Sequence, residues 1–109
     1  MDYYHDPDQR QTKELAPGVQ ARTFWGESLM LAVVTFDPNS TVPSHQHPHE
    51  QAGTVLSGEI EFVIAGERQR LRAGDVYLIP AQVEHSAKSG ENPARVLDIF
   101  TPVREDLKY

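Results

Sequence analysis

Turn signals recur roughly every 6 to 12 residues along this chain, and they leave no stretch that predicts a helix of ten residues. The segments between them are rich in β-branched and aromatic residues, which favour strands. Ser57 and Gly58 predict a tight hairpin between two of these segments. In total the sequence predicts about nine or ten short strands, a pattern typical of an all-β sandwich or barrel. The clearest expected strands are residues 19–25, 27–37, 54–56, 59–65, 67–72, 76–79, 84–88 and 95–100.

The length of 109 residues fits one domain with one hydrophobic core. Hydrophobic residues make up 39% and charged residues 24%, which is the composition of a globular chain rather than a disordered one. Residues 1–16 are mostly polar and show no apolar period, so they predict an N-terminal arm that is either disordered or lies across a neighbouring subunit. Residues 17–109 are expected to form the barrel domain.

Composition also limits the partners. The net charge of -6 argues against binding to polyanions, which needs clustered Lys and Arg. The longest apolar run, residues 29–34, is far shorter than the roughly 20 residues that cross a bilayer, and the acidic N-terminus does not resemble a signal peptide. We therefore expect a cytoplasmic protein without a nucleic-acid or membrane partner. Because the chain has no cysteine, any metal ligands must be nitrogen or oxygen atoms.

Four of the five histidines lie within residues 45–85. Alternate side chains of a strand share a face, so His45 and His47 would leave one strand about 7 Å apart. Two imidazoles at that spacing can converge on one ion. Gln51 can add an amide oxygen, and His85 a third imidazole if the fold brings its segment alongside the first. Together they predict a metal site of three histidines and one glutamine.

Three other residues near the histidine segments or in the arm are less favoured as metal ligands. His5 lies in the polar arm and is expected at the surface. His49 follows Pro48, which interrupts strand regularity, so we expect it beside the site or at its rim. Glu50 or a water molecule is the alternative to Gln51 as fourth ligand.

The two histidine segments resemble the paired motifs of the cupin superfamily. The first motif matches at His45, His47 and Gly58, with Gln51 where the family usually has an acid. The second motif matches at Gly74, Pro80 and His85, with Gln82 and Ser89 in place of a Gly and an Asn. This resemblance implies a single-domain cupin jelly-roll β-barrel whose metal ligands point inside.

The ligand set suggests the chemistry of the metal. Three neutral imidazoles and an amide add no charge, so a divalent ion there keeps its charge of +2. Ni, Zn, Fe, Mn and Co all accept such ligands as divalent ions. We therefore expect one divalent transition metal ion per chain, with two positions open to substrate if the ion is six-coordinate.

The last expected strand and its continuation carry Asp98, Phe100 and Arg104. By alternation, Asp98 faces either solvent or the interior beside Phe100, where a carboxylate would be a candidate for proton transfer. Arg104 precedes two acidic residues and could simply form a surface ion pair. The three residues resemble those of the small pectin- and alginate-pathway cupins known as KdgF, which convert cyclic 4,5-unsaturated uronates into the linear keto form. That resemblance implies that Asp98 moves a proton, Phe100 shapes the pocket and Arg104 pairs with the substrate carboxylate.

Two other functions stay open on the sequence. One is an oxygen-using cupin dioxygenase with Fe²⁺ in the same site, and the other is a binding or sensory cupin that holds a small acid without converting it. In each case the expected partner is a small molecule, such as an acidic sugar or a similar acid. A homodimer is also expected, because many small cupins pair through edge strands and an N-terminal arm.

Overall fold

The structure is a computed structural model that describes residues 3–109. Within this range the regular structure consists of ten strands and two short 3₁₀ helices, η1 (Pro7–Gln9) and η2 (Glu105–Leu107). The predicted all-β fold is therefore confirmed. No helix in the described range is long and apolar enough to cross a membrane. The strands are β1 (Lys13–Ala16), β2 (Val19–Trp25), β3 (Met30–Phe36), β4 (Thr41–His45), β5 (Glu50–Ser57), β6 (Glu59–Ile64), β7 (Glu67–Arg72), β8 (Val76–Ile79), β9 (His85–Ser89) and β10 (Ala94–Thr101).

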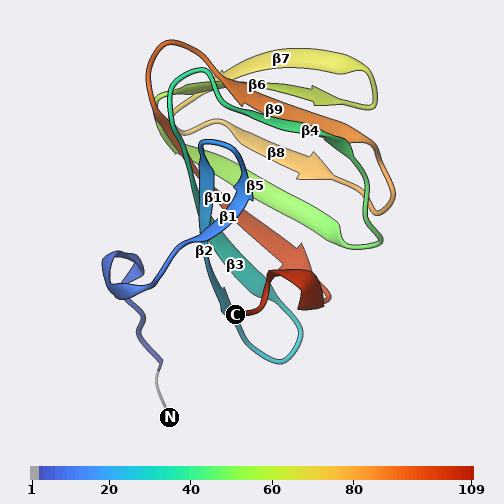
Figure 1. Cartoon of the computed structure of the whole chain (residues 1–109). Helices are drawn as coiled ribbons and strands as arrows, with labels where there is room; N and C mark the ends of the chain where they lie inside the picture. Colours follow the sequence, from blue (N-terminus) through green and yellow to red (C-terminus); the bar gives the residue numbers. More distant parts are fainter. Residues whose placement is uncertain (1–2) are drawn as a thin grey trace.

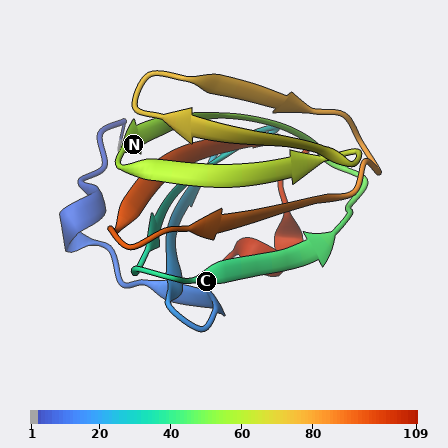
Figure 2. The same cartoon turned by 90° about the horizontal axis from the view of Figure 1, so that it is seen from above.

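The strands form two antiparallel sheets that face each other (Figure 1). One sheet has six strands in the order β1-β2-β3-β10-β5-β8, and the other has four in the order β4-β9-β6-β7. Seen from above, the two sheets enclose a common interior (Figure 2). Inward-facing side chains alternate with outward-facing ones, and the inward set forms the core. Its most deeply buried large members are Met30, Ile60, Ile79, Val19, Val55 and Val96.

The tight turn at Gly58 does not form the predicted hairpin. β5 pairs with β10 and β8, whereas β6 pairs with β7 and β9, so the turn carries the chain from one sheet to the other. Gly58 has a φ of 75°, and a Cβ atom there would lie 2.4 Å from the carbonyl oxygen of Pro93. Both the left-handed backbone and the close approach require glycine. Sequence alternation alone could not show that the two neighbouring strands separate.

The N-terminal arm ends as part of the barrel. Residues 1 and 2 of the predicted arm lie outside the described part of the chain. The following segment contains η1, and β1 then pairs antiparallel with β2. The Arg10 guanidinium lies 3.9 Å from the centre of the Tyr109 ring, so the arm also contacts the C-terminus of its own chain. The division into an arm of residues 1–16 and a barrel of residues 17–109 stays a proposal, with β1 joining the two.

Candidate metal centre

The structure brings the three predicted histidines together. His45 ends β4 and His85 begins β9, and the two are direct partners in the antiparallel ladder. Their ring centres are 4.3 Å apart, and the ring of His47 lies 5.1 Å from that of His85. Each ring offers one nitrogen, and these three atoms all lie within 4.8 Å of one another. This spacing suits convergence on a single ion.

His47 reaches the group from a loop and not from the strand that the alternation predicted. β4 ends at His45, and the residues before β5 are irregular. The loop is held by a backbone hydrogen bond in which the N–H of Gln82 donates to the carbonyl oxygen of His47 at 2.7 Å. Gln82 has a φ of 64°, which is a left-handed conformation. The cupin motif has Gly at this position, and Gly adopts such a conformation most easily. The turn after Pro80 therefore joins the two histidine segments.

Backbone carbonyl groups fix the orientation of all three imidazole rings. In each ring Nδ1 donates to a carbonyl oxygen two residues away along the chain. These contacts join His45 to Pro43 at 2.9 Å, His47 to His49 at 3.0 Å, and His85 to Val83 at 2.9 Å. A carbonyl oxygen only accepts, so Nδ1 carries the proton and Nε2 presents a lone pair.

Burial keeps two of these rings neutral. It lowers the pKa of His47 to about 4, with the positive charge of Arg104 as the next cause. Burial also lowers the pKa of His85, although the hydrogen bond to the Val83 carbonyl partly opposes it. Both rings are therefore uncharged at neutral pH, as metal ligands must be.

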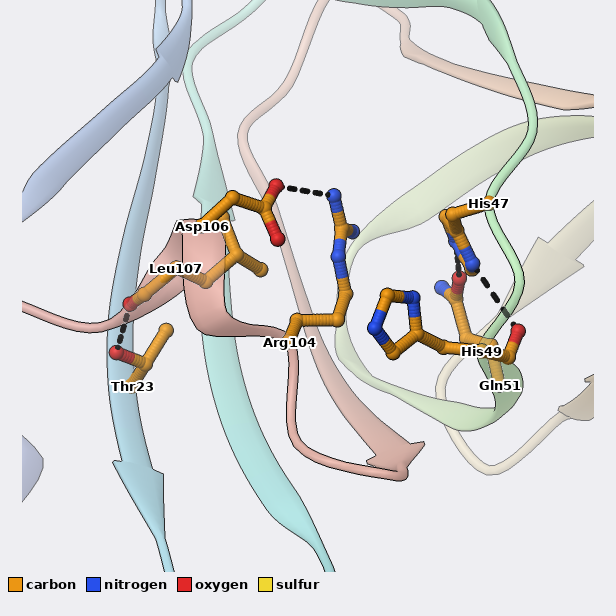
Figure 3. Close-up of polar contacts among 7 residues, drawn as sticks. All are labelled: Thr23, His47, His49, Gln51, Arg104, Asp106 and Leu107. Carbon is orange, nitrogen blue, oxygen red and sulfur yellow. Dashed lines mark hydrogen bonds and ion pairs between the residues drawn. The ribbon is translucent and has the colours of Figure 1, made fainter.

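The fourth predicted ligand comes from the opposite sheet. Gln51 lies in β5 and is buried, and its Oε1 is 3.1 Å from Nε2 of His47 (Figure 3). Because the single proton of His47 sits on Nδ1, this contact places two lone pairs against each other. A cation shared by both atoms would relieve that repulsion. In the described part of the chain, Nε2 of His85 is likewise buried without a hydrogen-bond partner. Glu50, the alternative ligand, is exposed. The donor set therefore fits a divalent metal ion.

Asp98 faces the interior, one of the two orientations that the sequence left open. It is 8% exposed and accepts a hydrogen bond of 2.5 Å from the hydroxyl of Tyr77. Burial raises the pKa of Asp98 to about 6, while hydrogen bonds from Tyr77 and Gln51 and the charge of Arg104 oppose the rise. The Gln51 amide thus turns its NH₂ group toward Asp98 and its oxygen toward His47.

Phe100 and Arg104 form another wall of the site. The Phe100 ring is buried and lies 5.7 Å from the His47 ring, edge to face. The Arg104 guanidinium carbon is 5.0 Å from the centre of the Phe100 ring. One terminal nitrogen of Arg104 makes an ion pair of 2.9 Å with Asp106, and the His49 ring lies on the other side (Figure 3). The Arg104 Nε is buried without a partner among residues 3–109, so this side chain keeps a free donor beside the histidines.

An interior cavity of about 60 Å³ is lined by most of the site residues, namely His45, Gln51, His85, Asp98, Phe100 and Arg104. Leu15 of β1 and Leu107 of η2 also line it, so both ends of the chain help to close the site. A larger hollow of about 900 Å³ lies elsewhere, beside Glu59, Glu61 and Lys88. It contains none of the predicted site residues, and its charged side chains mostly pair with one another. The cavity with the convergent polar groups is the better candidate site.

Comparison with known proteins agrees with this geometry. The cupin domain family matches residues 32–100. The chain belongs to the cupin family. It is 32% identical to the pectin degradation protein KdgF of Dickeya dadantii over 109 residues, which cover 98% of this cupin and 99% of that protein. The solved structure of KdgF from a Halomonas species matches with a TM-score of 0.91 at 30% identity, covering 99% of this chain and 100% of the other. The predicted cupin fold is confirmed.

Another relative, which matches over a smaller share of both chains, is named for a different activity. The 3-hydroxyanthranilate 3,4-dioxygenase of Burkholderia cenocepacia is 33% identical over 89 residues, which cover 78% of this cupin but only 50% of that enzyme. The match to KdgF thus extends over more of both chains.

Sequence reasoning missed two residues beside Asp98, namely Tyr77 and Gly53. Tyr77 reads as an ordinary strand residue, and its reach to β10 depends on strand order, which local patterns do not contain. Gly53 did offer a signal, because a glycine inside a strand often marks a close approach of another group.

We expect one divalent metal ion per chain, bound by His45, His47, Gln51 and His85. Affinity should fall as the pH drops, most steeply toward pH 4, because His47 gains a proton there and a protonated imidazole cannot bind the ion. Elemental analysis and titration calorimetry measure both effects. The double variant His47→Ala, His85→Ala should lose the metal, whereas His5→Ala should keep it. Full occupancy in the double variant would contradict the site.

We expect Asp98→Asn to stabilise the metal-free protein above pH 6. The pKa of Asp98 rises from 3.8 to about 6 on folding, so its contribution to stability falls as the pH rises through that window. Removing the buried charge should raise the free energy of unfolding by about 2 kcal/mol at pH 8. The gain should shrink toward pH 4, where the carboxyl group of the folded protein is protonated. Denaturant unfolding at both pH values tests this, and an equal difference at the two would refute it.

Proposed function

We propose that this protein linearises 4,5-unsaturated uronates, the sugars that pectin and alginate lyases release. The observation that carries the proposal is a buried carboxylate, Asp98, that lines one cavity with His45, His85 and the partly free guanidinium of Arg104. Similarity to KdgF over nearly the whole of both chains supports it. Asp98 and Arg104 together suit a substrate that carries a carboxylate and whose reaction requires a proton transfer.

The proposed reaction is an isomerisation. The hydroxyl on C1 loses its proton, C1 becomes a carbonyl carbon, and the bond from C1 to the ring oxygen breaks. The ring oxygen leaves as the enolate oxygen on C5, and C4 takes up a proton to give the C5 ketone. One proton leaves and one returns, so no oxidant, nucleotide or net water is consumed. A single carboxylate, Asp98, can carry that proton.

The other side chains would bind and orient the sugar. Arg104 has a free donor and would pair with the substrate carboxylate, while Asp106 holds its far side. Phe100 would exclude water beside the reacting atoms. The cavity is smaller than most ligand sites, which measure about 300–1,000 Å³, so we infer that only the reacting end of the sugar enters.

The metal in this proposal would be held by His45, His47, Gln51 and His85. Its bound form would supply a Lewis acid that holds a sugar oxygen and withdraws charge from it. All four ligands are neutral, so the choice among Ni, Zn, Fe, Mn and Co is left to metal analysis.

We expect the metal-loaded protein to speed the loss of the conjugated-alkene absorbance of unsaturated galacturonate or its alginate counterpart. Asp98→Asn should keep the metal yet lower kcat by about 10² to 10⁴, the usual worth of a positioned acid or base. Arg104→Ala should mainly raise KM, because it removes a partner of the substrate carboxylate. Asp8→Asn changes an exposed carboxylate of the arm and should leave both constants unchanged.

The spontaneous reaction provides the baseline for that assay. Decay at the spontaneous rate on both sugars would reject the uronate activity. Oxygen uptake with Fe²⁺ and an aromatic acid would then favour the dioxygenase alternative. Tight binding of a uronate without product would favour the binding or sensory alternative.

We also propose a homodimer that uses the outer face of the six-stranded sheet. Leu31 and Ile99 are cross-strand partners, and Ala52 joins them to Leu78 on the edge strand β8. Leu78 is 74% exposed and Val76, on the same strand, is 72% exposed. A continuous exposed apolar patch of this kind is typical of an interface, and a second copy would cover both patches at once.

Leu78→Glu should therefore convert the dimer into a folded monomer. Light scattering after size exclusion gives the mass, and circular dichroism checks the fold. Thr41→Glu places the same charge on an exposed position of the four-stranded sheet and should leave the dimer intact. A monomeric parent protein at micromolar concentration would refute this assembly.

A further inference from the structure

Tyr77 crosses the sheet to reach Asp98. It lies in β8 with its side chain buried, and its hydroxyl donates to Oδ1 of Asp98 at 2.5 Å. Tyr77 pairs with Gly53 of β5, and Gly53 pairs with Asp98 of β10. The three residues thus form one row across three neighbouring strands. The tyrosine side chain spans the middle strand to contact a residue two strands away.

Gly53 provides the space for this crossing. A Cβ atom at position 53 would lie 2.2 Å from Cζ and 2.3 Å from the hydroxyl oxygen of Tyr77. No other residue type would leave the ring where it is. Glycine inside a strand costs stability, so its presence here has a packing reason. That reason is the passage of the ring over the backbone.

The other sheet holds the ring from its opposite side. The Phe62 ring of β6 lies 4.3 Å from the Tyr77 ring, centre to centre. The tyrosine is therefore confined between Phe62 and the backbone at Gly53. Its hydroxyl also stays protonated, because burial and the nearby Asp98 charge raise the pKa of Tyr77 well above its usual range. Asp98 thus faces a fixed and permanent donor.

We propose that Tyr77 is a positioning residue for Asp98, and that its hydroxyl, admitted over Gly53, holds the carboxylate in the orientation used for proton transfer. The proposal rests on the function proposed above for Asp98. Without the Tyr77 hydroxyl, the Gln51 amide and the charge of Arg104 are the remaining groups among residues 3–109 that favour the charged carboxylate. Its rotation would then move the reacting oxygen away from the substrate.

The decisive variant is Tyr77→Phe, which keeps the ring between Phe62 and Gly53 and removes only the hydroxyl. We expect kcat to fall about 10- to 100-fold, the usual effect of misplacing a reacting group, with KM and metal content unchanged. In an Asp98→Asn background the same substitution should cost no further rate, because the group that it orients is already inactive. Tyr109→Phe is the matched control, since its hydroxyl donates to the backbone carbonyl groups of Gln11 and Ala21, away from Asp98.

The outcomes separate this inference from the proposed function. A parent protein without turnover would reject the uronate activity, and with it the role of Tyr77. An active parent with an equally active Tyr77→Phe variant would reject the positioning role alone. Equal losses of kcat in the parent and Asp98→Asn backgrounds would also reject it, because they would show an effect that does not pass through Asp98. Gly53→Ala, which keeps the hydroxyl but displaces the ring, should lower kcat as Tyr77→Phe does, and an unchanged kcat in that variant would contradict the packing argument.

Discussion

The site depends on three hydrogen bonds between histidine rings and the backbone beside them. Each Nδ1 donates to a carbonyl group two residues away, so the direction of each Nε2 is set by local geometry. The fold then has only to bring two segments together. The ladder does this by pairing His45 with His85, and the N–H of Gln82 adds the loop of His47. The local hydrogen bonds therefore set the direction in which each Nε2 points, whereas strand pairing and the Gln82 contact set the distances between the rings.

The interior of the barrel disfavours charge of either sign. Burial lowers the pKa of His47 and raises that of Asp98, so the same low polarity keeps an imidazole neutral and resists a carboxylate. Tyr77 and Gln51 offset part of that resistance by donating to Asp98. The result is an interior in which His47 and His85 stay neutral while one acid, Asp98, is retained. Keeping a buried acid at this position lowers the stability of the fold, a cost that functional sites commonly carry.

Much of this arrangement could be predicted from the sequence. The turn signals indicated the all-β class and most strand positions. The spacing of His45 and His47 suggested that two imidazoles converge, although His47 comes from a loop, and the inclusion of His85 depended on the fold bringing its segment alongside. Strand order was not predictable, because pairing between distant strands leaves no local pattern. The sequence therefore suggested a hairpin at Gly58 where the chain changes sheets, and it did not indicate that Tyr77 meets Asp98. It also left the orientation of Asp98 open, since alternation gives two faces without saying which is buried.

Gln82 shows how the fold overrides a local preference. A residue with a Cβ atom adopts a left-handed φ at a cost of about 1–2 kcal/mol, and the family motif has Gly at this position. Gln82 nevertheless keeps the turn, because its N–H must reach the His47 carbonyl and the next residue must lead into His85. The side chain is exposed and takes no part in either contact. What the motif requires here is thus a backbone shape, and neighbouring hydrogen bonds can impose that shape on glutamine.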